Sequence, residues 1–460
     1  MSLVIFNTLS REKEDFNPIL ESKVRMYTCG PTVYNYAHLG NLRTYIFEDV
    51  LKRVLLYNGY PTLHIMNVTD VGHLTGDRDM GEDKLEKEAK EENKKAKTLS
   101  KFYTKKFKED LKNLNIIFPN KFCLATKNIK EQIKMIQTLE EKGFTYKTSD
   151  GIYLDTSKVS DYTKLSHQNL EALWEGARVE KNIEKRNPTD FALWKFSPKD
   201  VKRQMEWNSP WGIGFPGWHI ECSAMSVKYL GDHFDIHCGA VDHINTHHTN
   251  EIAQTESATG RKPWVNYWVH GEFLVLREGE KMAKSTGNFM TLRSEFINHH
   301  INPLVFRYAT FTVHYRKQME WNNDIFESSV NGFNNLINKI KKLGDKVGDV
   351  NSLFQQNFLS TINDDLNMPK ALAVISELLK SGLSNEDKLA TMINFDMVLG
   401  FDLIKIKKDK IPKKVKKLSL LREKAREEKK WKESDKLRYE INKLGYEVKD
   451  TEDGQEISKK

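Results

Sequence analysis

The chain has 460 residues, of which 39% are hydrophobic and 30% are charged. A length above the roughly 100–200 residues of one domain predicts several domains, and this composition excludes an intrinsically disordered protein. No apolar run approaches the roughly 20 residues that span a bilayer, which excludes an integral membrane protein. The N-terminus lacks the basic flank of a signal peptide, so we expect a cytoplasmic protein. Four cysteines are too few for a disulfide framework.

The charge balance is mildly basic, with 72 Lys and Arg against 64 Asp and Glu and a net charge of +8. An excess of this size does not by itself indicate a nucleic-acid partner. Its distribution is more informative, because eight of the fourteen residues from Ile404 to Lys417 are lysine. This stretch predicts a basic linker that is available for phosphate contacts. The competing interpretation is a solvated charged face in a lysine-rich sequence.

Strand and helix patterns alternate in the first part of the chain. Val24–Thr28 predicts a short strand, and Cys29–Pro31 predicts a turn. A long amphipathic helix follows His38–Asn41, with apolar residues near the 3.6-residue period, and Thr62–Met66 predicts the next strand. Strand, glycine-containing loop, helix and strand form a βαβ unit. The fold class we predict is therefore α/β, with a doubly wound parallel (Rossmann-type) nucleotide-binding sheet.

Later segments predict an insertion into this sheet, a helix bundle and a small α/β C-terminal domain. The sheet is expected to resume with Phe234–His237 and Trp268–Leu276, and two short helices and a strand are expected at the end of the chain. The predicted boundaries are 1–115 for the first half of the Rossmann domain, 116–204 for the connective insertion, 205–275 for the second half with a metal site, 276–322 for a region with a lysine loop, 323–403 for the helix bundle, and 404–460 for the basic linker and the C-terminal domain.

Two short motifs are typical of polyphosphate binding. His38-Leu39-Gly40-Asn41 (HLGN) lies at a strand-to-helix turn, where free N–H groups and the helix dipole favour phosphate. Lys281-Met-Ala-Lys284-Ser285 (KMAKS) places two lysines three residues apart in a cationic loop without the glycine pattern of a Walker loop. Each motif alone is also compatible with an ordinary turn or a solvated loop.

A third group of residues has the chemistry of a metal site. His247 and Glu251 are four residues apart and therefore share one face of a helix. Cys29 and Cys222 could add two thiolates, and zinc accepts sulfur, nitrogen and oxygen ligands. The alternative is that the cysteines are small buried core residues, which is the interpretation we keep for Cys123 and Cys238.

Taken together, these motifs resemble those of class I aminoacyl-tRNA synthetases, which carry a HIGH tetrad and, some 200 or more residues later, a KMSKS loop. Here HLGN and KMAKS are 243 residues apart. Within that class the sequence resembles the cysteinyl-tRNA synthetases over nearly the whole chain. The matching stretches are Tyr27–Tyr34 (YTCGPTVY), Asn67–Asp70 (NVTD), Asn187–Trp194 (NPTDFALW), Gly217–Met225 (GWHIECSAM), His247–Gln254 (HHTNEIAQ) and Asp364–Leu372 (DDLNMPKAL). Two departures are Asn41 in place of the last His of the tetrad and Ala283 in place of Ser.

The resemblance implies a role for each motif residue. It implies one zinc ion held by Cys29, Cys222, His247 and Glu251, and a stem-contact region at 276–322 and an anticodon-binding domain at 404–460. His248 and Glu221 adjoin two of these ligands in sequence, so we expect them to contact the ligands. It implies that ATP, with Mg²⁺, is bound by His38, Gly40, Asn41, Asp242, Lys281 and Lys284, of which His38, Asn41 and the two lysines are catalytic. It implies that cysteine is bound by Gly30, Thr69, Trp218 and His237.

The function implied is a ligase that activates L-cysteine with ATP and transfers it to the 3′ end of tRNA(Cys). Zinc would select the substrate thiol, because a hydrophobic pocket separates side chains that differ by one group by only about 1–3 kcal/mol. We expect a monomer without membrane association. Two alternatives are a ligase that couples cysteine to an amino-sugar, which would lack residues 404–460, and a zinc hydrolase or a non-catalytic RNA-binding module.

Overall fold

The structure is a computed structural model that describes residues 2–72, 84–92, 94–168, 183–198, 203–276, 289–408, 412–451 and 454–459. The chain divides into two compact units, Met1–Phe401 and Asp402–Lys460, which are described separately. No helix within the described ranges is both long and apolar enough to cross a membrane.

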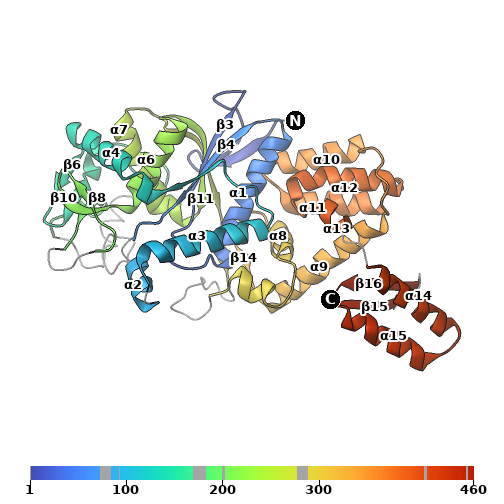
Figure 1. Cartoon of the computed structure of the whole chain (residues 1–460). Helices are drawn as coiled ribbons and strands as arrows, with labels where there is room; N and C mark the ends of the chain where they lie inside the picture. The colour runs from blue at the N-terminus through green and yellow to red at the C-terminus, as the bar shows by residue number, and fades with distance from the viewer. Residues whose placement is uncertain are drawn as a thin grey trace. The chain divides into compact units, whose positions relative to one another are not determined.

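A five-stranded parallel sheet forms the centre of the first unit (Figure 1). Its strands, in spatial order, are β12 (Val265–Gly271), β11 (Phe234–Ala240), β3 (Val24–Thr28), β4 (Thr62–Val68) and β5 (Lys121–Leu124). Every neighbouring pair is parallel, so all five carboxyl ends lie at the same edge of the sheet. The prediction of a doubly wound parallel sheet is confirmed.

Helices pack on this sheet through continuous apolar faces. Helix α1 (Leu39–Tyr57) connects β3 to β4 and buries Leu42, Ile46, Val50 and Val54 at the spacing of one helix face. Helix α6 (Trp218–Leu230) contacts β3 and β4 and contributes Met225 and Leu230 to the core around Tyr27. Two further helices follow β4 in the chain, α2 (Lys84–Glu91) and α3 (Ala96–Asn113).

A second, antiparallel sheet interrupts the parallel one, as the sequence predicted. Its strands, in spatial order, are β6 (Thr145–Lys147), β7 (Gly151–Leu154), β8 (Phe191–Phe196), β10 (Gly212–Pro216) and β9 (Trp207–Ser209). Three strands fall on the other side of the expected 116–204 boundaries. β5 belongs to the parallel sheet, because it pairs with β4. β9 and β10 continue the antiparallel sheet beyond residue 204, because β10 pairs with both β8 and β9.

Helices dominate the rest of the first unit. They are α8 (Leu304–Phe311), which precedes the bundle predicted over 323–403, and α9 (Asn323–Lys342), α10 (Ser352–Asn363), α11 (Met368–Lys380) and α12 (Asn385–Leu399), which lie within it. A hairpin of β1 (Val4–Asn7) and β2 (Glu12–Asp15) and a pair formed by β13 (Leu274–Val275) and β14 (Met319–Glu320) complete it. The strand predicted at Trp268–Leu276 is therefore divided, because β12 stays in the parallel sheet while β13 pairs with β14. The hairpin of β1 and β2 was not predicted.

A buried ion pair joins α1 to the bundle. The Asp49 carboxylate lies 2.7 Å from Arg53 Nε and 2.6 Å from Arg307 Nη2, and all three side chains are buried. Arg307 also donates from Nε to the carbonyl of Leu399 at 2.6 Å. The two arginines lower the pKa of Asp49 against the opposing effect of burial. The charges are therefore paired within the core, where an isolated ion would be strongly unfavourable.

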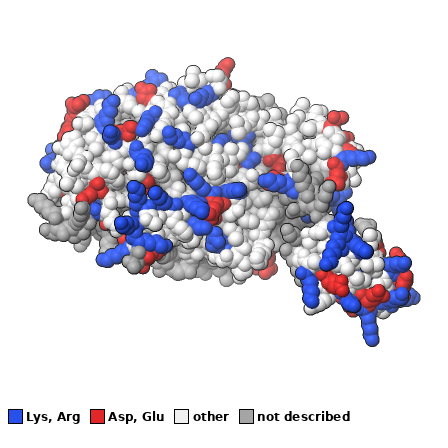
Figure 2. All heavy atoms as spheres, in the orientation of Figure 1, with Lys and Arg blue, Asp and Glu red and all other residues white. Residues whose placement is uncertain are grey.

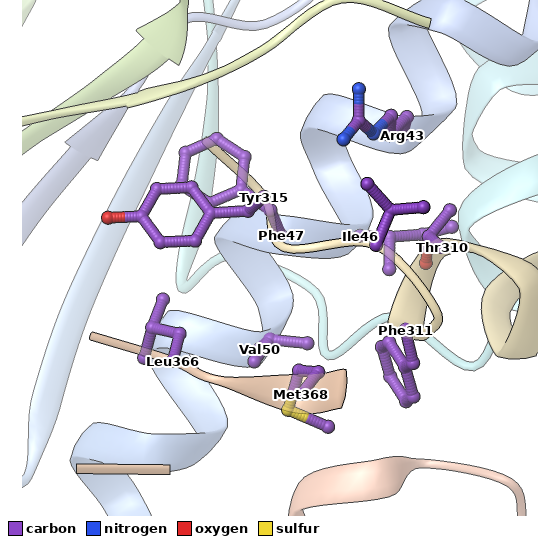
Figure 3. A pocket seen from close by; sticks show the side chains of 10 residues that line it. Arg43, Ile46, Phe47, Val50, Thr310, Phe311, Tyr315, Leu366 and Met368 are labelled. Atoms are coloured by element: carbon purple, nitrogen blue, oxygen red, sulfur yellow. The ribbon is translucent and has the colours of Figure 1, made fainter. Parts of the chain in front are cut away.

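Figure 3 shows a cavity beside the same contact, between α1 and the segments around Phe311 and Met368. Its wall is mostly apolar, with Phe47 stacked on Tyr315 and Arg43 at one end. The cavity holds about 20 Å³, which is room for about one water molecule. It is a packing gap rather than a ligand site.

The second unit is a small α/β domain with its own core. It contains α13 (Leu403–Lys408), α14 (Lys413–Glu427), α15 (Trp431–Lys443), β15 (Tyr446–Thr451) and β16 (Gly454–Lys459). Val415, Ile441 and Val448 pack together, and the buried Arg422 guanidinium holds Asp450 at 2.7 and 2.9 Å. The predicted basic linker is largely helical, and residues 409–411 lie outside the described part of the chain.

We predict that Arg307→Met lowers the unfolding free energy of the first unit by about 3–5 kcal/mol, because removing one partner of a buried ion pair leaves the other charge undercompensated. Urea unfolding followed by tryptophan fluorescence measures the effect. Lys346→Met, which removes an exposed cation, is the matched control and should change the unfolding free energy by less than about 0.5 kcal/mol. Equal stability of the two variants would contradict the role given to this ion pair.

Candidate functional site

A cleft of about 820 Å³ opens at the carboxyl edge of the parallel sheet, where ligands bind in doubly wound folds. Parallel pairing sets its floor, because β3, β4 and β11 end side by side and are followed by Cys29, Thr69 and Asp242. Nine of the predicted site residues line the cleft: Cys29, Gly30, His38, Asn41, Thr69, Trp218, Cys222, Asp242 and His247.

Gly30 is required by the close approach of two strand ends. A Cβ atom at this position would lie 1.8 Å from the Asn67 carbonyl oxygen. The Gly30 N–H donates to Asn67 Oδ1 at 2.7 Å, and Asn67 Nδ2 donates to Thr69 Oγ1 at 3.1 Å. The floor of the cleft beside Cys29 is thus a hydrogen-bonded backbone surface.

The HLGN motif forms the N-terminus of α1, as predicted, and closes it with a reciprocal cap. The Asn41 N–H donates to His38 Nδ1, and the His38 N–H donates to Asn41 Oδ1, both at 3.2 Å. This is the capping-box arrangement, with Asn41 three residues after the cap. Gly40 is needed beside it, since a Cβ would lie 2.9 Å from the His38 ring.

The cap fixes the protonation state of His38. Because Nδ1 accepts a hydrogen bond, the neutral ring carries its proton on Nε2. Burial lowers the pKa of His38 to about 4, although the Asp242 carboxylate acts in the opposite direction. The imidazole at the helix N-terminus is therefore a neutral hydrogen-bond donor at physiological pH.

The four predicted metal ligands come together. Cys29 follows β3, Cys222 lies in α6, His247 lies in the π-helical turn η3 (Ile244–His248), and Glu251 lies in the first turn of α7 (Thr249–Thr259). Their ligand atoms all lie within 4.8 Å of one another, and all four residues are buried. Two thiols, one imidazole and one carboxylate at this separation form a donor set that fits zinc.

The surroundings of the cluster favour the ionised form of the Glu251 carboxyl group. Glu251 Oε1 lies 3.0 Å from His247 Nε2, and Oε2 lies 3.0 Å from His237 Nε2. Burial raises the Glu251 pKa, but the two histidines outweigh it and lower the pKa to about 2. The other ring nitrogen of His247, Nδ1, lies 2.9 Å from His219 Nδ1, the kind of outer contact that orients a metal-binding imidazole.

A second set of four residues, Cys29, His237, His248 and Glu251, brings its ligand atoms equally close together. His237 and His248 have no exposed surface, and neither lines the cleft. Cys222 and His247 do line it. Of the two sets, Cys29, Cys222, His247 and Glu251 would therefore hold a metal ion closer to the cleft, within reach of a substrate.

His237 lies behind the cluster instead of beside the cleft, although the resemblance implied a role in cysteine binding. Its ring stacks on Trp268 at 4.6 Å and its Nε2 holds Glu251. Thr69 and Trp218 do line the cleft; Thr69 donates to Glu221 Oε2 at 3.1 Å, and the Trp218 ring lies 4.6 Å from the His247 ring.

Sequence reasoning missed a chain of polar contacts behind the metal cluster. Cys29 Sγ lies 3.3 Å from His248 Nε2, His248 Nδ1 lies 2.7 Å from His270 Nε2, and His270 Nδ1 lies 2.7 Å from Thr8 Oγ1. Burial lowers the pKa values of both histidines well below their usual range. His270 follows no motif and lies in β12, so only the parallel pairing of β12 with β11 brings it to this place.

The predicted lysines, Lys281 and Lys284, lie outside the described residues. The chain on both sides of them is tied to α1. Upstream, Arg43 donates to the carbonyls of Glu272 and Phe273; downstream, the Leu39 N–H donates to the Met290 carbonyl at 2.9 Å. Helix α1 therefore anchors both flanks of the KMAKS segment beside the HLGN motif, although 243 residues separate the two motifs in sequence.

Comparisons with known proteins agree with this architecture. The family profile described as "tRNA synthetases class I (C) catalytic domain" matches residues 15–331, and the profile "Cysteinyl-tRNA ligase anticodon binding domain" matches residues 410–457. A cysteine–tRNA ligase of Burkholderia lata is 46% identical over 99% of this chain and 97% of its own length, and one of Treponema denticola is 45% identical over 88% and 87%. The structure of Mycobacterium tuberculosis methionyl-tRNA synthetase with methionyl-adenylate aligns with a TM-score of 0.57 at 14% identity, covering 84% of this chain and 93% of that one, and supports the fold.

We predict that the His38 imidazole titrates with a midpoint near pH 4 in the folded protein, measured by NMR with labelled histidine and assigned with His38→Gln. Unfolded His38 titrates near 6.5, so the unfolded state takes up the proton first as the pH falls. The stability that neutral His38 contributes is therefore present above pH 6.5 and lost between pH 6.5 and 4, with a slope of up to roughly 1.4 kcal/mol per pH unit. A midpoint at or above 6.5 would refute the capped, neutral ring.

Proposed function

The chain belongs to the cysteine–tRNA ligase family of class I tRNA synthetases, and from this membership we infer that it joins L-cysteine to the 3′ end of tRNA(Cys) with ATP as the energy source. The cysteine carboxylate attacks the α-phosphate of ATP, giving cysteinyl adenylate and pyrophosphate. The terminal adenosine hydroxyl of the tRNA then attacks the activated carbonyl and releases AMP. The observation that carries this proposal is that the sulfur-rich cluster and the N-terminus of α1 line one cleft.

The N-terminus of α1 supports the role proposed for HLGN in adenylate formation. The helix dipole and the neutral His38 ring, which donates from Nε2, stabilise phosphoryl oxygens, whereas the Leu39 and Asn41 N–H groups already donate to Met290 and to His38. Asn41 uses Oδ1 for the cap, which leaves its Nδ2 to donate. We assign Lys281 and Lys284 to the leaving pyrophosphate and Asp242, which is exposed in the cleft, to the nucleotide. Most of this catalysis is positioning and electrostatic stabilisation, and Mg²⁺ accompanies ATP.

We propose that the metal cluster selects cysteine by its thiol. One zinc ion bound by Cys29, Cys222, His247 and Glu251 would supply a position that takes a thiolate readily and a neutral hydroxyl poorly. His237 and His219 orient two of these ligands from behind. Gly30, Thr69 and Trp218, which line the cleft around the cluster, would hold the amino-acid backbone, and His237 would act on the substrate through Glu251, which its Nε2 contacts at 3.0 Å.

The second unit supports anticodon recognition, since the anticodon-binding profile covers residues 410–457. We propose further that the protein works in the cytoplasm as a monomer. Cysteine-dependent ATP–pyrophosphate exchange tests the adenylation step and separates a ligase from a zinc hydrolase or an RNA-binding module. Charging of tRNA(Cys) then separates it from a ligase that couples cysteine to an amino-sugar.

We predict that Cys222→Ser lowers the zinc content and steeply weakens cysteine binding, because a hydroxyl is a poor replacement for a thiolate ligand. Serine binding should hardly change. The preference for cysteine should therefore fall to at most the roughly 10–200-fold that a pocket of side chains provides. Metal analysis and equilibrium binding of both amino acids measure these effects.

Cys123→Ser is the matched control, because Cys123 is equally buried, donates to the Met66 carbonyl and belongs to neither cluster. It should keep both zinc and the preference for cysteine. Circular dichroism must show that both variants are folded. A folded, zinc-free Cys222→Ser protein that still prefers cysteine would assign selection to the pocket wall and leave zinc a structural role.

We predict that deletion of residues 402–460, the second compact unit, spares cysteine-dependent pyrophosphate exchange, because every described residue of the cleft precedes it. Charging of tRNA should fall sharply, and the remaining tRNA affinity should depend less on salt, since the deletion removes lysine-rich segments. Undiminished charging by the truncated protein would show that this unit is not a tRNA reader.

A further inference from the structure

A lysine-rich surface with an exposed aromatic ring flanks the cleft. Helix α3 carries six lysines and two acidic residues, a net charge of +4 within eighteen residues, and it follows the lysine-bearing α2. Figure 2 shows Lys and Arg side chains spread over the area where Figure 1 draws these two helices. Such a surface attracts a polyanion.

Phe102 is the feature that an ordinary charged helix face does not explain. Its side chain is 38% exposed, although α3 has a well-formed apolar face that buries Leu99, Tyr103 and Phe107. The ammonium groups of Lys94 and Lys106 lie 5.3 and 5.7 Å from the centre of the Phe102 ring. An exposed ring with two lysine ammonium groups over it has the components by which proteins bind single-stranded nucleic acid, because a base can stack on the ring when the lysines turn to the neighbouring phosphates.

The Phe102 ring is connected to the cleft by a row of aromatic contacts. Phe102 meets Tyr36 edge-on at 6.3 Å, and Tyr36 lines the cleft two residues before His38. Tyr103 packs edge-on against both rings, at 5.2 Å from Tyr36 and 5.1 Å from Phe102. Lys87 of α2 and Phe107 of α3 also line the cleft, so these two helices form one of its walls.

We propose that Phe102, Lys94 and Lys106, which we call the α3 platform, bind the single-stranded 3′ end of the tRNA as it enters the cleft. The inference rests on the proposed function, because the terminal adenosine must reach the activated carbonyl near His38. A duplex stem presents no free base face, whereas the single-stranded end does. Lys94 pairs with Glu92 at 2.7 Å and Lys106 with Glu109 at 2.8 Å, and such surface pairs are weak enough to exchange for phosphate.

The test compares Phe102→Ala with Phe118→Ala, which removes a similarly exposed phenylalanine (43%) that does not line the cleft. Loss of one base stack should raise the Kd for tRNA(Cys), and the KM for charging, roughly 5- to 100-fold in Phe102→Ala. Cysteine-dependent pyrophosphate exchange should be unchanged, because it needs no tRNA. Phe102→Trp, which keeps a ring, should restore binding, and Phe118→Ala should behave as the native protein.

A tRNA(Cys) transcript without its 3′ single-stranded nucleotides identifies what the platform binds. Native protein and Phe102→Ala should bind this truncated tRNA equally. Lys94→Gln and Lys106→Gln should each lower the salt dependence of binding to full-length tRNA, by about 0.7 in the log–log slope for each phosphate that the variant no longer neutralises.

Two results would overturn the platform. One is native-like charging by Phe102→Ala, and the other is an equal loss of affinity for full-length and truncated tRNA, which would assign the surface to duplex RNA. Failure of the proposed function looks different, since the native protein itself would then not charge tRNA(Cys) with cysteine.

Discussion

The arrangement of the site depends on the contacts of the buried Glu251 carboxylate with His237 and His247. The Glu251 side chain has no exposed surface, and an ion in that position is unfavourable by several kcal/mol unless it is compensated. Compensation comes from His247 on one carboxylate oxygen and His237 on the other, both at 3.0 Å. His237 is in turn fixed by stacking on Trp268. The negative charge of Glu251 therefore accounts for two of the buried histidines behind the cleft, His237 and His247.

Helix α1 performs the corresponding task for the phosphate side of the cleft. Its N-terminus is closed by His38 and Asn41, and its second turn carries Arg43, whose guanidinium donates to backbone carbonyls of two separate segments, Glu272–Phe273 and His314–Lys317. Burial lowers the pKa of Arg43 to about 10, which still leaves it charged at neutral pH. One helix thus positions the HLGN motif and both flanks of the KMAKS segment.

The sequence was sufficient wherever the information is local. Helical periodicity and the turn residues located β3, α1 and β4, and the i, i+4 spacing of His247 and Glu251 correctly placed both at one point. The His38–Asn41 cap could also have been found, because its spacing is that of a capping box. The lysine run around 413 obscured a helix whose buried positions, such as Val415 and Ala425, still follow the helical period. The sequence could not show that β5 belongs to the parallel sheet or that His248 contacts His270, because both depend on segments that are far apart in the chain or lie in different strands and helices.

Selection of cysteine and binding of the tRNA end are proposed at different residues of one cleft, the first at buried residues and the second at exposed ones. Cysteine differs from serine by one atom, so its recognition requires ligands fixed within the core, and Cys29, Cys222 and Glu251 are each less than a tenth exposed. The proposed contact with a flexible nucleic-acid end instead uses lysines and a ring at the surface, and stacking on a ring does not depend on which base is bound. Variants of the buried cluster should therefore change which amino acid is activated, whereas variants of α3 should change how well tRNA is used. His38 and Tyr36, which contacts Phe102, line the same cleft as Cys29, Cys222 and His247, so the two proposed recognition sites share one cavity.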